Sequence, residues 1–163
     1  MTTMTTYETL SLLLQLVVGS AAFVTLWFLY RQLRLMQEQL LAAQEATKAQ
    51  SALSLVNFLQ ASEVRSARQC VRRVLSQKAL VDWTPQEREA ASMVCANYDV
   101  AAGLLRANLA PAGLVINNWG PSIRHCYAVL KPYIDECRTG PGGHPSYWSN
   151  FDWLCAEARR GEA

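Results

Sequence analysis

The stretch "SAAFVTLWFLYRQLRLMQEQL" (residues 20–40) decides how this chain folds, because one apolar pattern runs through it from a charge-free segment into a polar one. Arg31 and Arg34 stand at the foot of the apolar run, yet leucine and methionine keep recurring beyond them. In a simple membrane anchor, the apolar pattern would end at these arginines and a polar linker would follow. We therefore expect one helix that continues from lipid into water.

Upstream of Arg31 the chain has the length and composition of a membrane span. No charged residue occurs from Leu10 to Tyr30. A helix of that length measures roughly 32 Å at about 1.5 Å per residue, against a hydrocarbon core of about 30 Å. Trp27 and Tyr30 sit at one end, where aromatic rings favour the headgroup level. These features predict a transmembrane helix over residues 10–30.

The distribution of basic residues predicts the orientation of this span. The first nine residues carry no Lys or Arg, whereas Arg31 and Arg34 directly follow the span. By the positive-inside rule, residues 1–9 form an extracytoplasmic tail and everything after Arg31 is cytoplasmic. A cleaved signal peptide would need a basic n-region and a shorter apolar core, so we favour a permanent single-pass anchor.

Counting by alternate steps of four and three reveals an apolar stripe: Gln15, Gly19, Ala22, Leu26, Leu29, Leu33, Met36, Leu40 and Ala43. This 3.5-residue period is typical of a left-handed coiled coil. It predicts a coiled-coil-like juxtamembrane helix over residues 31–50, although Leu35 and Leu41 lie off the stripe. The stripe fades at Thr47.

The same register selects small and polar residues inside the membrane. Gly19 and Ala22 let helix backbones approach closely, and Gln15 can bond across helices. A Gln side chain facing lipid would be costly. Since one chain supplies one span, the simplest partners are other copies of the chain. We therefore expect a parallel homo-oligomer of four or more copies in membrane lipid.

Two functions fit such an oligomer. In one, the helix is only an anchor and a dimerisation seam. In the other, the copies surround a pore lined by Gln15, Gly19 and Ala22, which rings of Leu26 and Leu29 close by dewetting. The residues alone favour the anchor, because oligomeric single-span anchors are more common than pores.

The remainder of the chain predicts an all-α cytosolic domain, residues 51–163, of four to five helices. No segment alternates with period two. Thr84, Pro85 and Glu87 form the pattern of a helix start with a capping box. We expect Pro121 to start the next helix and Pro132 to kink it. Pro145 is expected to open the last helix.

Composition and cysteines narrow the class of protein. The 163 residues, of which 51% are hydrophobic and 17% charged, support one modest domain plus accessories. A net charge of +2 is too small to name a partner. The five cysteines are odd in number and form no CxxC pair, which indicates a reducing compartment and thiols acting as small buried hydrophobes.

A row of arginines is the main candidate binding site. Arg65, Arg68 and Arg72 share one helix face, with Arg73 beside them. Guanidinium groups in a row suit phosphates, although the residues alone favour a solvated surface face. A straight helix would set Arg65 roughly 50 Å below Arg31. The surface potential of the lipid decays within about 8 Å, so contact of the row with anionic lipid is not expected unless the chain folds back. Repeated around an oligomer, the row would suit a polyanion such as an oligonucleotide.

Other chemistry is weakly represented. The chain contains no G-x-S-x-G, phosphate loop or HExxH motif, so we expect no enzyme. We expect no cofactor and no metal, because no zinc spacing is matched by His125, Cys126, Cys137, His144 and Cys155. Tryptophans beside arginines can hold bases, but those at helical spacing more often belong to a core, and we assign Trp119 and Trp148 to packing.

At "YRQLRLMQEQLLAAQ" (residues 30–44) and "LVINNWGPSIRHCYAVL" (residues 114–130) the chain resembles small bacterial membrane proteins with one N-terminal span and a helical cytosolic domain. It also resembles the membrane effector of Hailong-type anti-phage systems. The second resemblance implies an oligomeric inner-membrane ion channel in antiviral defence, controlled by DNA oligomers from a partner nucleotidyltransferase. It moves the preference from anchor to pore. A membrane-tethered adaptor that recruits a protein partner is the alternative.

Overall fold

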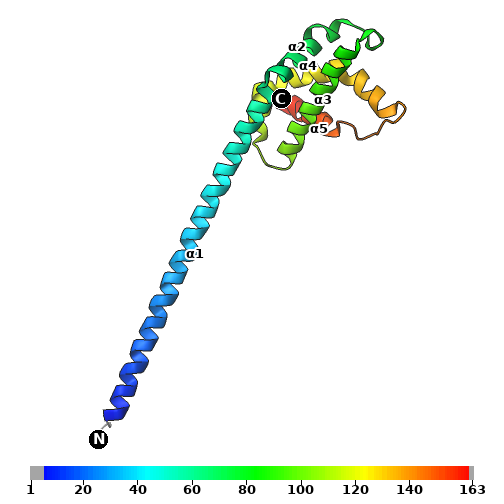
Figure 1. The fold of residues 1–163 in the computed structure, drawn as a ribbon. Coiled ribbons are helices and arrows are strands. Elements are labelled where there is room, and N and C mark those ends of the chain that lie inside the picture. The colour runs from blue at the N-terminus through cyan, green and yellow to red at the C-terminus, as the bar shows by residue number, and fades with distance from the viewer. Residues whose placement is uncertain (1–5, 162–163) are drawn as a thin grey trace. The chain divides into compact units, whose positions relative to one another are not determined.

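The computed structural model describes residues 6–161, with the side chains of all of these except residues 6–9 and 12. Within that range the chain is built of five α-helices and two short 3-10 helices, without a β-strand (Figure 1). The predicted all-α class is confirmed. The chain divides into two compact units, Met1–Ala46 and Thr47–Ala163.

Helix α1 (Thr6–Gln60) supplies the described part of the first unit. It runs without interruption through residues 10–30 and 31–50, which confirms that one helix continues past the arginines. It is long and apolar enough to cross a membrane. Its described side chains from residue 10 to residue 46 are all exposed. Of the predicted tail, residues 1–5 lie outside the described range, and residues 6–9 already belong to α1.

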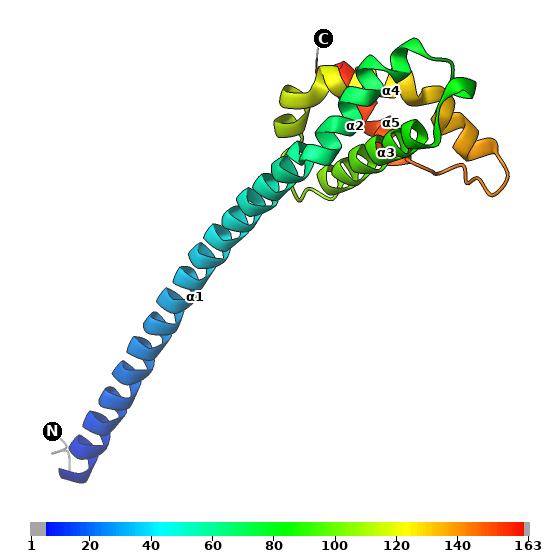
Figure 2. The same ribbon diagram turned by 45° about the horizontal axis from the view of Figure 1, so that its top comes forward.

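The second unit combines the last turns of α1 with α2 (Ser62–Arg73), α3 (Pro85–Arg106), α4 (Ala112–Thr139) and α5 (Ser149–Arg160). The 3-10 helices η1 (Leu75–Gln77) and η2 (Leu80–Asp82) connect α2 to α3. Helix α3 packs against α2, α4 and α5, and α4 also packs against α2 and α5 (Figure 2). The unit therefore has the four to five helices that the sequence predicts.

The core of this unit is formed by apolar residues three or four apart on each helix, as amphipathic helices require. Helix α1 contributes Leu55 and Leu59, and the largest fully buried side chains are Tyr98 of α3 and Phe151 of α5. These two rings stack at 5.1 Å between centroids. Each such side chain contributes roughly 1.5–3 kcal/mol by leaving water. Three of the five free cysteines, Cys95, Cys126 and Cys155, are buried in the same core, as expected of small apolar side chains.

The predicted start of α3 is confirmed in detail. The Thr84 hydroxyl accepts a hydrogen bond from the Glu87 backbone N–H at 3.3 Å, and the Glu87 carboxylate accepts one from the Thr84 N–H at 2.8 Å. Pro85 occupies the first helical position, where its missing N–H costs nothing. Lys78 also pairs with Glu87, and that hydrogen bond lowers the pKa of the carboxyl.

Two predicted helix starts are wrong. Pro121 does not start a helix but lies inside α4, which begins at Ala112 after Pro111. Each interior proline removes one backbone hydrogen bond, but buried Trp119 and Ile123 on either side of Pro121 keep the helix packed against the core. Pro132 lies inside the same helix, as predicted.

The second wrong start is Pro145, because α5 begins only at Ser149. The reason is a cap from another helix. The Asp99 carboxylate of α3 accepts hydrogen bonds from the backbone N–H groups of Asn150 and Phe151, at 2.9 and 3.1 Å. Trp148 precedes the helix in a left-handed conformation with φ 53°. Such a cap cannot be read from local sequence.

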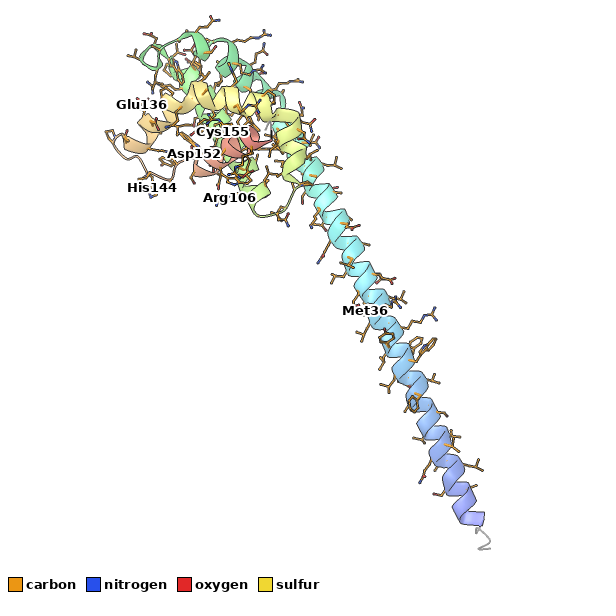
Figure 3. The ribbon with its side chains drawn as sticks, turned by 180° about the vertical axis from the view of Figure 1, so that it is seen from behind. Met36, Arg106, Glu136, His144, Asp152 and Cys155 are labelled. Carbon is orange, nitrogen blue, oxygen red and sulfur yellow. The ribbon has the colours of Figure 1, made fainter. Side chains whose placement is uncertain are left out.

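A network of polar contacts joins α4 to α5. The Asp152 carboxylate, labelled in Figure 3, accepts hydrogen bonds from the Tyr127 hydroxyl and the Arg138 guanidinium, both at 2.7 Å. Glu136, labelled in the same view, pairs with Arg88 of α3 at 2.9 Å. Arginines in this part of the domain therefore have carboxylate partners.

Candidate anion-binding pocket

Helix α2 presents its arginines beside an apolar face. Val64, Ala67 and Val71 are buried against the core. Arg68 lies one turn beyond Val64 and adjoins Ala67, so it sits at the edge of the buried face. Its side chain is only 7% exposed, whereas Arg65, Arg72 and Arg73 are exposed. Three of the four arginines are thus exposed to solvent, and the fourth is buried.

These four arginines line a cavity of about 560 Å³ between α2 and α4, which we call the arginine pocket. On α4, Asn118, Ser122 and His125 are three or four residues apart, which places them on one helix face, and Trp119 adjoins Asn118. The lining side chains are Arg65, Arg68, Gln69, Arg72 and Arg73 of α2, and Asn118, Trp119, Ser122 and His125 of α4. The structure brings all four predicted ligand-binding arginines together.

Arg68 is the only buried charged side chain among the described residues. Its Nη1 atom is inaccessible to solvent and has no hydrogen-bond partner. A buried donor left unsatisfied costs about 1–3 kcal/mol, and more when it is charged. Burial of this guanidinium therefore lowers the stability of the unliganded domain.

The titratable groups that interact with Arg68 are the Tyr98 hydroxyl and the Cys126 thiol, and both are neutral. The Tyr98 and Ser122 hydroxyls are hydrogen-bonded at 3.1 Å, and Ser122 lies 4.0 Å from the Cys126 sulfur. Burial raises the pKa of Tyr98 to about 12, although Ser122 and the Arg68 guanidinium act to lower it. Burial also raises the pKa of Cys126, opposed by Ser122, Arg72 and Arg68. Both groups stay protonated at neutral pH and supply no negative charge to Arg68.

No Asp or Glu side chain lines the arginine pocket, and none pairs with its four arginines among residues 6–161. Elsewhere in the domain Arg88, Arg138 and Arg160 each pair with a carboxylate. The pocket therefore concentrates uncompensated positive charge, with one guanidinium held out of water. An anion placed there would meet several charge-assisted donors.

The predicted pore positions lie in the first unit. Gln15, Gly19, Ala22, Leu26 and Leu29 follow one face of α1 by their spacing, and all are exposed. A side chain at Gly19 would meet no atom within 4 Å. The continuation of the apolar stripe at Leu33, Met36 and Leu40 is exposed as well, and Met36 is labelled in Figure 3.

A second, apolar groove of about 360 Å³ lies within the second unit. It is formed by the end of α1, the end of α3 and the connection to α4. Phe58, Val100 and Leu109 on this groove are 38%, 52% and 48% exposed. Of the apolar side chains at this end of α1, Leu55 and Leu59 are buried in the core, whereas Leu53 and Phe58 are exposed.

The α4 side of the arginine pocket is absent from the sequence-based prediction. Asn118, Ser122 and His125 recur three or four apart, and this polar spacing is the signal that could have identified them. Trp119 is buried, as assigned, yet it also lines the pocket. His125 enters the sequence-based prediction only as a rejected metal ligand. In the part of the chain that the structure describes, no three His, Cys, Asp or Glu side chains gather to hold a metal ion.

Comparison with known proteins yields one match. A family model described as a domain of unknown function (DUF4760) matches residues 15–158. No curated protein and no solved structure matches the chain. The matched range includes the exposed face of α1 from Gln15 onward and every residue of the arginine pocket.

Proposed function

The chain belongs to the family described as a domain of unknown function (DUF4760), and we propose that it is a homo-oligomeric inner-membrane effector whose cytoplasmic pocket binds an anionic ligand that controls an ion pore. The proposed role involves no catalysis, metal or cofactor. It is that of a bacterial anti-phage effector, in keeping with the resemblance to Hailong-type systems. The proposed ligand is a DNA oligomer made by a partner nucleotidyltransferase.

The arginine pocket is the observation that carries this proposal. Four arginines line one cavity without a carboxylate, and one of them, Arg68, is buried and has an Nη1 atom without a hydrogen-bond partner. Proteins bury a charge when it is paired or when it serves a site. An oligonucleotide supplies phosphate groups that would compensate this charge. Binding would be strongly salt-dependent, because it releases counterions.

The membrane part of the proposal rests on α1. The charge-free segment 10–30 is followed by Arg31 and Arg34, so the positive-inside rule favours an external N-terminus and a cytoplasmic second unit. An exposed face with Gln15, Gly19 and Ala22 suits contact with further copies of α1. Gln15 would wet the axis of four or more copies, and Leu26 and Leu29 would form the gate.

Conductance in planar bilayers tests the proposal. The purified full-length chain should conduct, and a short single-stranded DNA oligomer should change the open fraction. Combined Arg65→Gln, Arg68→Gln and Arg72→Gln substitutions should remove the response to DNA but leave the conductance itself. A folded oligomer that never conducts, with DNA present or absent, would exclude the pore.

The apolar groove favours a second candidate function, a membrane-tethered adaptor that recruits a protein partner without forming a pore. Exposed apolar side chains in a groove are typical of interaction surfaces. Gln15→Leu distinguishes the two candidates. It should have little effect on an adaptor, whereas it should abolish conductance through a pore that depends on Gln15 for water.

A further inference from the structure

We infer that the arginine pocket takes the phosphate-bearing end of its ligand, a terminal phosphomonoester, and that Arg68 selects it over an internal phosphodiester. This inference rests on the proposed function, in which an oligonucleotide binds the pocket. It adds the chemical group that is recognised and the residue that recognises it.

The difference in exposure between Arg68 and the other three arginines is the first support. Arg65, Arg72 and Arg73 are exposed and accessible to a nucleic-acid backbone lying across α2. Arg68, only 7% exposed at the edge of the core, is out of reach of such a backbone. A group that compensates its charge must enter the cavity. The end of a strand can enter, whereas its middle would have to fold sharply.

The size of the cavity agrees with an inserted end. A volume of about 560 Å³ falls within the range of roughly 300–1,000 Å³ that is typical of small-molecule pockets. It has room for one small phosphorylated group. A continuous groove that tracks a strand would be longer and lined by several aromatic side chains. Here the lining has one aromatic ring besides His125, that of Trp119, which is only 8% exposed.

The donors of the pocket suit a dianion. A phosphomonoester carries about −1.5 to −2 charges and three acceptor oxygens at neutral pH, whereas an internal diester carries one charge and two free oxygens. Because Tyr98 stays protonated, its hydroxyl can donate to Ser122 at 3.1 Å, which frees the Ser122 proton to donate into the pocket. Arg68 and Ser122 then act on one phosphate, with the exposed arginines around it.

Asn118 indicates which group is attached to the phosphate. One of its two side-chain N–H groups donates to the Leu114 carbonyl at 2.7 Å, which leaves the other N–H as a donor and the oxygen as an acceptor. A neutral amide with one donor and one acceptor suits a hydroxyl or amino group of the ligand. This is the arrangement expected for a sugar or base attached to a single terminal phosphate.

The test uses the full-length chain in mild detergent and short oligothymidylates with a 5′-phosphate, a 3′-phosphate or hydroxyls at both ends. Fluorescence anisotropy should give roughly tenfold to a hundredfold tighter binding for a phosphate-ended strand, as charge-assisted hydrogen bonds produce. A preference for only one of the two ends also supports the inference and assigns the polarity. Inorganic phosphate should compete.

The variants identify the selecting residue. Arg68→Gln should remove the preference for phosphate ends and leave the weaker affinity for the hydroxyl-ended strand. Arg73→Gln, the matched exposed control, should weaken all strands alike and reduce the salt dependence. Arg68→Lys retains the charge and should retain part of the preference. Thermal melting of each variant shows that a lost preference is not lost folding.

Equal binding of hydroxyl-ended and phosphate-ended strands, or a preference that survives Arg68→Gln, would overturn the inference. In either case, DNA that still changes the conductance leaves the proposed function standing. If no strand binds and inorganic phosphate has no effect on melting, the inference fails as well. If the conductance of the same preparation also does not respond to DNA, the proposed function is refuted as well.

Discussion

Arg68 is the residue at which stability and function conflict in this domain. A core position filled by a charge without a counter-charge is normally replaced by an apolar side chain at little cost or with a gain. Here the guanidinium lies beside neutral Tyr98 and faces a cavity lined by three more arginines. Strain of this kind is typical of binding sites, where the ligand supplies what folding lacks.

We predict that Arg68→Met stabilises the unliganded protein. Methionine fills similar space without a charge, so the free energy of unfolding in urea should rise by about 1–2 kcal/mol, even after loss of contact with Tyr98. Arg73→Met, at an exposed site, should change stability by less than about 0.5 kcal/mol. Marked destabilisation by Arg68→Met would mean that the arginine serves the fold.

Tyr98 makes the stability of the domain depend on pH in the alkaline range. Its pKa is about 12 in the folded state, against about 10 in an unfolded chain. The folded protein therefore holds the proton more tightly, and this contribution is complete below pH 10 and is lost as pH rises toward 12. Cys126 acts to raise the pKa of Tyr98, and Ser122 and Arg68 act to lower it.

Tyr98→Phe should flatten this dependence. The variant should lose about 1 kcal/mol at neutral pH with the Ser122 hydrogen bond. Between pH 10 and 12 its stability should decline less than that of the parent, by on the order of 2 kcal/mol. Urea unfolding followed by circular dichroism at several pH values measures both effects. Parallel declines in the two proteins would show that another group controls the alkaline loss.

At the scale of elements, α1 differs from the other helices because the part of it in the first unit buries none of its described side chains within the chain. Helical stability in water normally comes from burying an amphipathic face. Between residues 10 and 46 every described side chain is exposed. The charge-free segment can bury its surface in lipid, but Leu33, Met36 and Leu40 lie beyond it. These residues need other protein surfaces, and the 3.5-residue period indicates further copies of α1.

Adjacent leucines test this stripe. Leu40 belongs to the 3.5-residue series and Leu41 does not, although they are 60% and 62% exposed. Leu40→Gln should weaken the oligomer by about tenfold or more through lost apolar burial, whereas Leu41→Gln should not. Light scattering after size-exclusion chromatography in mild detergent measures the mass. Equal effects of the two substitutions, or a monomeric parent protein, would refute contact between copies of α1 along the stripe.

At the scale of the whole molecule, each unit carries a different part of the proposed activity. Met1–Ala46 contains the predicted span and the predicted gate. Thr47–Ala163 contains a closed core, the arginine pocket and the apolar groove. The proposed ligand binding would depend on side chains of the second unit alone, since all the pocket residues belong to it.

Replacing residues 10–30 by an unrelated single span should separate these parts. The chimaera should bind a phosphate-ended oligothymidylate as tightly as the parent, because the pocket is untouched. It should lose ligand-controlled conductance, because Gln15, Leu26 and Leu29 are absent. Binding by fluorescence anisotropy and conductance in planar bilayers are measured on one preparation. A chimaera that retains full activity in cells would support the adaptor instead.

The sequence by itself determined the all-α class, the uninterrupted α1 and the capped start of α3, because each depends on contacts within a few residues. It also placed Arg65, Arg68 and Arg72 on one helix face, with Arg73 beside them. Tertiary structure decided what lies opposite them. Asn118, Ser122 and His125 reach the pocket only because α4 packs against α2, and Arg68 is buried because α2 packs against its neighbouring helices, with Tyr98 of α3 beside it. Likewise α5 begins at Ser149 because Asp99, from another helix, caps it. Burial and charge compensation arise between segments distant in the chain, so local spacing cannot reveal them.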